Sequence, residues 1–175
     1  IDFETNIDWK ESHLILKTAF PVDVNTNKAT YDIQFGSVER PTHKNTSWDA
    51  ARFEVCAHKY CDLSEYGYGV SLMNDCKYGW DKPADNTIRL TLLHTPYNIG
   101  DFIYQNHQDF GRHIFKYSIV GHNGDYRQAC VTRKAEVLNQ PLKAFVTPKH
   151  SGTYGRQFSF AESLNANVAL KAVKQ

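Results

Sequence analysis

Residues 68–80, YGVSLMNDCKYGW, begin as a β-strand and then break the pattern with an amide and an acid. Tyr68, Val70 and Leu72 share one face of an extended segment, which is typical of a half-buried strand. The next residue in that phase is Asn74. A core-facing row that ends in an amide raises the question of what the end of this strand does.

The same alternation of apolar and polar residues recurs along the chain. The segment between residues 22 and 30 is rich in turn residues, so the two alternating segments that flank it are predicted to form a hairpin. No alternation of strands and helices precedes residue 120, which favours a mainly β protein built as an antiparallel β-sandwich. The alternating segments are 13–22, 30–36, 52–58, 68–74, 87–94 and 112–120.

One helix is predicted near residues 123–138, where apolar residues recur at helical spacing. Asn123 is the expected N-cap and Pro141 lies beyond the end. A further strand is expected around 142–146. Because both ends of the chain fall inside alternating segments, the chain is expected to be a single segment, residues 1–175, of a larger protein.

Composition excludes several classes of function. The formal net charge is +1 and no run of Lys or Arg is present, so neither nucleic acid nor a membrane surface is an expected partner. The four cysteines are expected to be free, partly buried thiols, because a chain of 175 residues needs no disulfides to fold. Asn45 begins an N-glycosylation triplet, which matters only in a secreted protein.

A second strand ends in the same way as the first. In the segment 87–94, alternate apolar residues are followed in phase by His94. If the two strands are neighbours, Asn74, Asp75, Tyr78 and His94 lie at one sheet edge and face a hydroxylated ligand. Alternatively, these polar groups mark where each strand leaves the core and satisfy loop backbone groups. The pattern alone leaves both interpretations open.

Metal binding and nucleophilic catalysis find little support. The spacing of Cys56, His58 and Cys61 matches no standard zinc site, so no metal is predicted in this chain. No common nucleophile or phosphate-binding motif is present. The acids are numerous, but one sequence cannot show which pair has the separation that glycoside hydrolysis requires.

A longer run of residues is more specific than any of these motifs. Residues 40–79, RPTHKNTSWDAARFEVCAHKYCDLSEYGYGVSLMNDCKYG, resemble the glycoside hydrolase family 38 α-mannosidases, in their cytosolic and vacuolar branch. Supporting similarities lie at 8–22, 90–96, 111–119 and 168–175, so the resemblance covers nearly the whole chain.

The resemblance implies a large, retaining, zinc-dependent exo-α-mannosidase that removes terminal α-mannose from oligosaccharides. Its catalytic carboxylates and zinc ligands would lie in an N-terminal domain absent from this chain, which would be inactive alone. This chain would belong to the C-terminal β-sandwich region, of supersandwich-like form. The implied partners are the catalytic and helical domains, a mannose-containing oligosaccharide and further copies in a homo-oligomer. The implied location is cytoplasmic or vacuolar/lysosomal.

The resemblance also bears on the polar strand ends. It implies that Asn74, Asp75, Tyr78, His94 and Thr95 border the mannose pocket of the missing catalytic domain. A sugar needs fixed hydrogen-bond partners beside an aromatic face, which these residue types supply.

Other segments are expected to serve interfaces. Trp48 and Asp49 are expected to lie at the interface with another domain. The loop 97–110 departs from the family pattern, and its role at the pocket or an oligomer interface is open. Two other functions remain possible on the residues alone: a stand-alone carbohydrate-binding β-sandwich without catalysis, and a purely structural oligomerisation domain.

Overall fold

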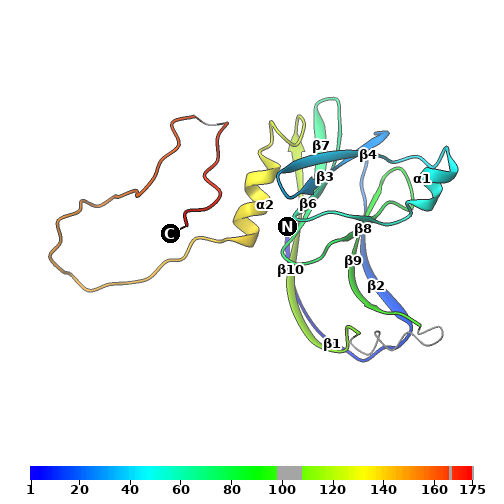
Figure 1. The fold of residues 1–175 in the computed structure, drawn as a ribbon, viewed down its shortest axis with the longest axis horizontal. Helices are drawn as coiled ribbons and strands as arrows, with labels where there is room; N and C mark the ends of the chain where they lie inside the picture. The colour runs from blue at the N-terminus through cyan, green and yellow to red at the C-terminus, as the bar shows by residue number, and fades with distance from the viewer. Residues whose placement is uncertain (98–107, 166, 175) are drawn as a thin grey trace. The chain divides into compact units, whose positions relative to one another are not determined.

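The chain folds into two antiparallel β-sheets and two short helices (Figure 1). The computed structural model describes residues 1–97, 108–165 and 167–174. The six-stranded sheet has the order β1-β10-β7-β6-β3-β4, and the four-stranded sheet has the order β2-β9-β8-β5. The elements are β1 (Asp2–Trp9), β2 (Leu14–Pro21), β3 (Lys28–Ile33), β4 (Gly36–Pro41), α1 (Ser47–Ala51), β5 (Val55–Cys56), β6 (Tyr60–Glu65), β7 (Tyr68–Asn74), β8 (Gly79–Asp81), β9 (Thr87–Thr95), β10 (Gly111–Asn123) and α2 (Val131–Asn139).

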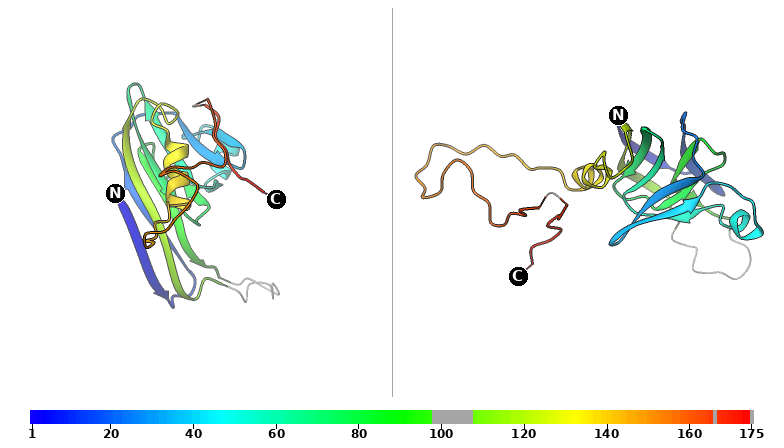
Figure 2. Two further views of the ribbon diagram at one scale, coloured as in Figure 1. Left: turned by 90° about the vertical axis from the view of Figure 1, so that its left-hand side faces the viewer. Right: turned by 90° about the horizontal axis from the view of Figure 1, so that it is seen from above.

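The main hydrophobic core lies between the two sheets. Leu63 and Leu72 of the six-stranded sheet belong to one buried cluster with Trp80 and Leu90 of the four-stranded sheet. Burial of each such side chain contributes about 1.5–3 kcal/mol relative to exposure, so this cluster is the main reason why the sheets stay together. The predicted mainly β, antiparallel sandwich is therefore confirmed. Figure 2 shows β1 and β10 side by side along one edge of the larger sheet.

Helix α2 covers the other face of the six-stranded sheet (Figure 1). Val131 and Ala135 of the helix form a second buried cluster with Tyr60 of β6 and Met73 of β7. Strand β7 is therefore buried on both faces, with Leu72 in the main core and Met73 under the helix. The prediction that this strand is half-buried was wrong, because α2 covers the face that was expected to be exposed to solvent.

The predicted hairpin between residues 13–22 and 30–36 was wrong. Strand β2 pairs with β9 in one sheet, whereas β3 pairs with β4 and β6 in the other. The connection between β2 and β3 contains Val24, whose side chain is buried in the main core. Because an apolar residue anchors this connection between the sheets, the chain crosses from one sheet to the other instead of turning back.

The predicted strand 52–58 is reduced to the two residues of β5, and a helical turn that the alternation did not reveal precedes it. The N-cap of helix α1 is Thr46, whose hydroxyl accepts a hydrogen bond from the Asp49 backbone N–H. The Asp49 carboxylate accepts one in return from the Thr46 backbone N–H, which completes a capping box. The signal for this helix was present in the sequence as Thr-x-x-Asp.

The predicted helix exists, but it begins later than expected. Asn123 is the last residue of β10, and the N-cap is Cys130, with a left-handed φ of 52°. Between them, the Asp125 carboxylate accepts hydrogen bonds from the backbone N–H groups of Arg127 and Gln128, which favours a turn over a helix. The strand expected around 142–146 does not form.

Residues 143–175 form a second unit. Its described residues contain neither helix nor strand. Within it, the ring of Phe158 contacts those of Tyr154 and Phe160 at centroid distances of 4.4 and 4.8 Å. Several apolar side chains in this unit, such as Phe160 and Leu164, are exposed.

The four cysteines are unpaired, and Cys61 is buried while the other three are exposed. No helix in the described part of the chain is both long and apolar enough to span a membrane.

Candidate functional site

A cavity lies where β7 ends, and three of the five predicted site residues line it. It encloses about 390 Å³, counting the space at its open mouth. Beyond the predicted residues, the lining comes from the segment before β6 and from the end of α2. We call it the Asn74 cavity; its lining residues are His58, Lys59, Asn74, Asp75, Tyr78 and Asn139.

Asn74 holds the walls of this cavity together. Its side chain is 1% exposed; Nδ2 donates to the His58 carbonyl at 2.8 Å, and Oδ1 accepts from the Lys77 N–H at 2.5 Å. Its backbone N–H donates to the Lys59 carbonyl, and its own carbonyl accepts from Asn139 Nδ2 at 2.9 Å. Asn74 therefore fixes three segments of chain around the cavity, which was one of the two roles considered for a polar strand end.

Asp75 presents an oxygen that has no partner within the described residues. Its Oδ2 accepts a hydrogen bond from the Lys116 backbone N–H at 3.0 Å, whereas Oδ1 is buried and makes no hydrogen bond there. Partial burial raises the pKa of the adjacent Cys76 thiol to about 11, and the Asp75 carboxylate acts in the same direction. A buried carboxylate oxygen without a donor is costly, so it is suited to accept a hydrogen bond from a ligand hydroxyl or from another segment.

Tyr78 gives the cavity an accessible aromatic side chain. It is 53% exposed, and its ring meets the imidazole of His58 edge to face at a centroid distance of 5.7 Å. An aromatic ring beside a free acceptor and an imidazole is the combination that a hydroxylated ligand requires. His58 was considered from the sequence only as a metal ligand, and Asn139 was not considered, because its place beside β7 depends on how α2 docks.

His94 and Thr95 do not join this cavity. They end β9, which pairs with β2 and β8 in the four-stranded sheet, whereas β7 pairs with β6 and β10 in the six-stranded sheet. The condition that the two strands are neighbours is therefore not met. The His94 backbone N–H donates to Asp109 Oδ2 at 2.9 Å, and the buried Thr95 hydroxyl donates to the Glu11 carbonyl at 2.6 Å.

A bulge explains why His94 does not face the core as its phase predicted. Opposite Leu16 and Lys17, the register of β9 shifts by one residue, so that Leu92 and Leu93 are both buried. After an extra residue in a strand, each following side chain points to the opposite face of the sheet from the one that simple alternation predicts. As a result His94 is exposed and Thr95 is buried.

The remaining sequence candidates lie in different environments. Among the described residues, no three or more His, Cys, Asp or Glu side chains are grouped so that they could hold a metal ion. Cys56 is exposed on β5, whereas Cys61 is fully buried in the main core, where burial raises its thiol pKa to about 12. Trp48 is 75% exposed on α1, while Asp49 is engaged in the capping box.

A buried polar cluster on the helix-covered face of the six-stranded sheet was missed from the sequence. His122 Nε2 lies 2.7 Å from Asp62 Oδ1, which also accepts a short hydrogen bond from the Ser71 hydroxyl, and Ser64 donates to Asp62 Oδ2 at 2.6 Å. Gly69 makes the room, because a Cβ there would lie 2.6 Å from His122 Cε1. The four side chains come from three adjacent strands, so only the strand order brings them together.

Comparison with known proteins adds a family. Residues 1–98 match the family described as glycosyl hydrolases family 38 C-terminal domain. The chain is 43% identical over 176 residues to alpha-mannosidase 2C1 of Homo sapiens, and this match covers all of the chain and 16% of the human protein. It is 46% identical over 125 residues to an alpha-mannosidase of Saccharomyces cerevisiae, covering 71% of the chain and 11% of the yeast protein.

The same fold occurs in a solved structure. An alpha-mannosidase from Enterococcus faecalis V583 superposes with a TM-score of 0.76 at 23% identity, over 87% of this chain and 18% of that one. At this identity the similarity supports the fold alone. The family match over more than half of the chain supports more: this chain belongs to glycosyl hydrolase family 38, as its C-terminal domain.

Proposed function

We propose that this chain is part of a larger retaining, zinc-dependent exo-α-mannosidase and that it borders the sugar pocket of that enzyme. The observation that carries the proposal is the family match over residues 1–98, together with relatives that are named α-mannosidases. The chain spans 16% of the length of the human relative, so the groups that perform the reaction would lie outside residues 1–175.

The Asn74 cavity is the part of the surface best suited to face the sugar. Within it, Asp75 Oδ1 lacks a donor among the described residues and Tyr78 has an exposed ring, so these two residues would contact a hydroxyl-rich ligand directly. Asn74 would act by holding the loop, because both ends of its amide are already hydrogen-bonded. His94 and Thr95 would border the pocket only from the other sheet.

Zinc would be held elsewhere. The described residues of this chain offer no cluster of three metal-binding side chains, so they do not fit the zinc that the proposed enzyme requires. The contribution of this chain would be to place loops and hydrogen-bond acceptors around a sugar, and no step of the reaction passes through a metal bound to it.

The proposed partners follow from the same reasoning. They are the catalytic and helical domains of the enzyme, a mannose-containing oligosaccharide, and further copies of the protein in a homo-oligomer. The proposed location is the cytoplasm or the vacuole/lysosome, as for the branch of the family that the sequence resembles.

An activity assay tests the proposal. The full-length protein should hydrolyse an aryl α-mannoside with retention of configuration and should contain stoichiometric zinc. Residues 1–175 alone should show neither activity nor zinc. Hydrolysis by residues 1–175, or a full-length protein without mannosidase activity, would contradict the proposal; sugar binding without turnover by the full-length protein would favour a carbohydrate-binding module instead.

A further inference from the structure

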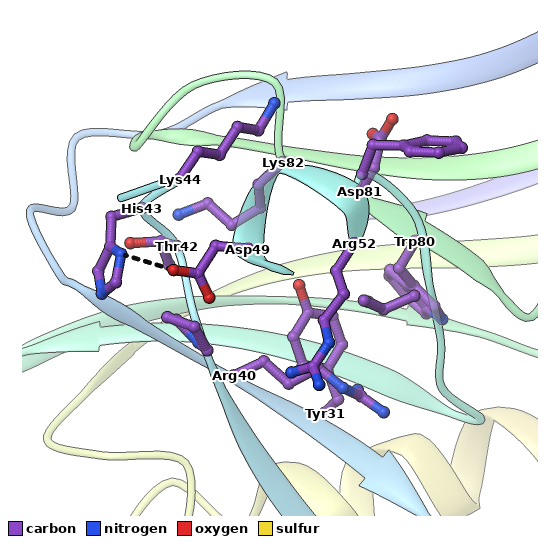
Figure 3. Close-up of a pocket in the computed structure, with 13 residues that line it drawn as sticks. Tyr31, Arg40, Thr42, His43, Lys44, Asp49, Arg52, Trp80, Asp81 and Lys82 are labelled. Carbon is purple, nitrogen blue, oxygen red and sulfur yellow. Dashed lines mark ion pairs between the residues drawn. The ribbon is translucent and has the colours of Figure 1, made fainter. Parts of the chain in front are cut away.

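A second pocket, away from the Asn74 cavity, is strongly cationic (Figure 3). It lies beside the end of β4, helix α1 and strand β8. We call it the Arg40 pocket. Four lysine or arginine side chains line it but only two acids, a formal excess of two positive charges before His43 is counted; they are Arg40, Lys44, Arg52, Lys82, Asp49 and Asp81.

The two acids neutralise these cations only in part. Asp49 is used by the capping box of α1 and lies 3.7 Å from His43 Nδ1. Asp81 lies 2.5 Å from Arg89 and 3.0 Å from Lys17, so its charge is already paired outside the pocket. Asp49 keeps its negative charge in the pocket, so one carboxylate without a lysine or arginine partner faces the four cations of the lining.

Arg40 shows most clearly that the arginines of this pocket lack hydrogen-bond acceptors. Its guanidinium lies over the ring of Tyr31 at 4.8 Å, and its Nη1 is buried without a hydrogen-bond partner in the described structure. Arg52 extends toward Arg40 (Figure 3), and within the described part of the chain its side chain makes no hydrogen bond or ion pair. Both guanidinium groups lie at the same end of the pocket in Figure 3, and an oxyanion bound there would pair with both.

Lys82, in the loop after β8, lines another part of the pocket, and its side chain extends away from the guanidinium groups of Arg40 and Arg52 (Figure 3). Its ammonium donates to the Asp85 carbonyl at 2.6 Å, and no carboxylate of the described residues pairs with it. Burial lowers the pKa of Lys82, with the charges of Cys61 and Asp85 acting in the opposite direction.

We infer that the Arg40 pocket binds a phosphate group, free or as a monoester, between Arg40 and Arg52. A phosphate carries more negative charge than a carboxylate and has three oxygens available, so it can accept hydrogen bonds from both guanidinium groups at once. Guanidinium groups bind such oxyanions through paired N–H donors, which an ammonium cannot do. The ring of Phe53 on the pocket wall is exposed and offers an apolar surface to an organic substituent on the phosphate.

Calorimetric titration of the full-length protein with inorganic phosphate, at constant ionic strength, tests the inference. Arg52→Gln should weaken phosphate binding by at least about tenfold, because one charge-assisted pair of hydrogen bonds is lost. Arg52→Lys should fall between this variant and the wild type. Arg112→Gln, which removes an exposed arginine of β10 outside the pocket, should bind phosphate as the wild type does.

Two further probes define the ligand class. Phenyl phosphate should bind with the same dependence on Arg52, whereas acetate at equal ionic strength should neither bind nor compete. Equal phosphate affinity in wild type and Arg52→Gln, absence of saturable binding, or acetate binding as tightly as phosphate would overturn the inference. The readout is binding at one named side chain, so it succeeds or fails independently of mannosidase activity.

Discussion

The Asn74 side-chain amide makes hydrogen bonds within the protein through both its nitrogen and its oxygen, so a substitution at Asn74 is expected to affect stability. The amide bridges the His58 carbonyl and the Lys77 N–H, and the Asn74 side chain that does so is buried. From the sequence, Asn74 was predicted to end a core-facing row of strand residues. The sequence did not indicate which groups its amide would hydrogen-bond. Those partners come from the segments before and after β7, and their approach depends on the tertiary fold.

Asn74→Ala should lower the free energy of unfolding by about 2–3 kcal/mol, because two backbone groups lose their partner in a buried site. Tyr78→Ala, on the exposed side of the same cavity, should change it by less than about 0.5 kcal/mol. Urea denaturation of both variants measures the difference. An Asn74→Ala protein as stable as Tyr78→Ala would show that the amide does not hold the loop.

Gly69 gives a second prediction at a single residue. Gly69→Ala should destabilise the protein by about 1–3 kcal/mol, because the added Cβ would lie 2.8 Å from the Leu63 carbonyl as well as against His122. Gly36→Ala is the matched control, since a Cβ there meets nothing within 4 Å. Thermal unfolding that ranks the two variants equally would contradict the close packing of this cluster.

At the scale of elements, alternation located the strands better than it located their partners. The period of two identified β2, β7, β9 and β10, because their core faces are continuous rows of apolar residues. Which strands pair depends on the segments that connect them. The connection after β2 carries Val24, which is buried in the main core, and leads into the other sheet. The bulge in β9 reverses which of the last residues of the strand face the core, and simple alternation does not predict such a bulge.

On the outer face of the four-stranded sheet, Asp81 of β8 binds side chains of β9 and β2. Arg89 Nε and Nη2 donate to its two oxygens at 2.7 and 2.5 Å, and Lys17 Nζ donates at 3.0 Å. Burial alone would raise the pKa of Asp81, but the hydrogen bonds from Arg89 and Lys17 outweigh it and lower the pKa below its ordinary 3.8. The carboxylate form therefore stabilises the folded state.

The stability that Asp81 contributes should depend on pH in the acid range. Because the folded pKa is lowered, this stability is present above pH 3.8 and is lost as the pH falls through the folded value. Asp81→Asn should thus be less stable than the wild type at pH 7, and the gap should narrow as the pH falls below 3.8. Urea titrations at several pH values measure the gap, with the exposed Asp8→Asn as control. A gap that does not change with pH would contradict the account.

At the scale of the whole molecule, the sandwich and the family could be predicted from residues 1–175, whereas the composition of the site could be predicted only in part. Asn74, Asp75 and Tyr78 share a cavity because they are close in sequence at one strand end. His94 and Thr95 were grouped with them on the assumption that β7 and β9 are neighbours, and the two strands lie in different sheets. His58 and Asn139 reach the cavity from other elements and left no signal in the sequence.

The most direct test of the central proposal, that the Asn74 cavity faces the sugar, is the kcat/KM of Asp75→Asn in the full-length enzyme with an aryl α-mannoside. This near-isosteric change keeps an acceptor for the Lys116 N–H but replaces the unpartnered oxygen with an amide group. We expect kcat/KM to fall by about 10- to 100-fold, the loss of one hydrogen bond to a charged acceptor, while the melting temperature stays close to that of Asp8→Asn. An Asp75→Asn enzyme with wild-type kcat/KM would contradict the proposal.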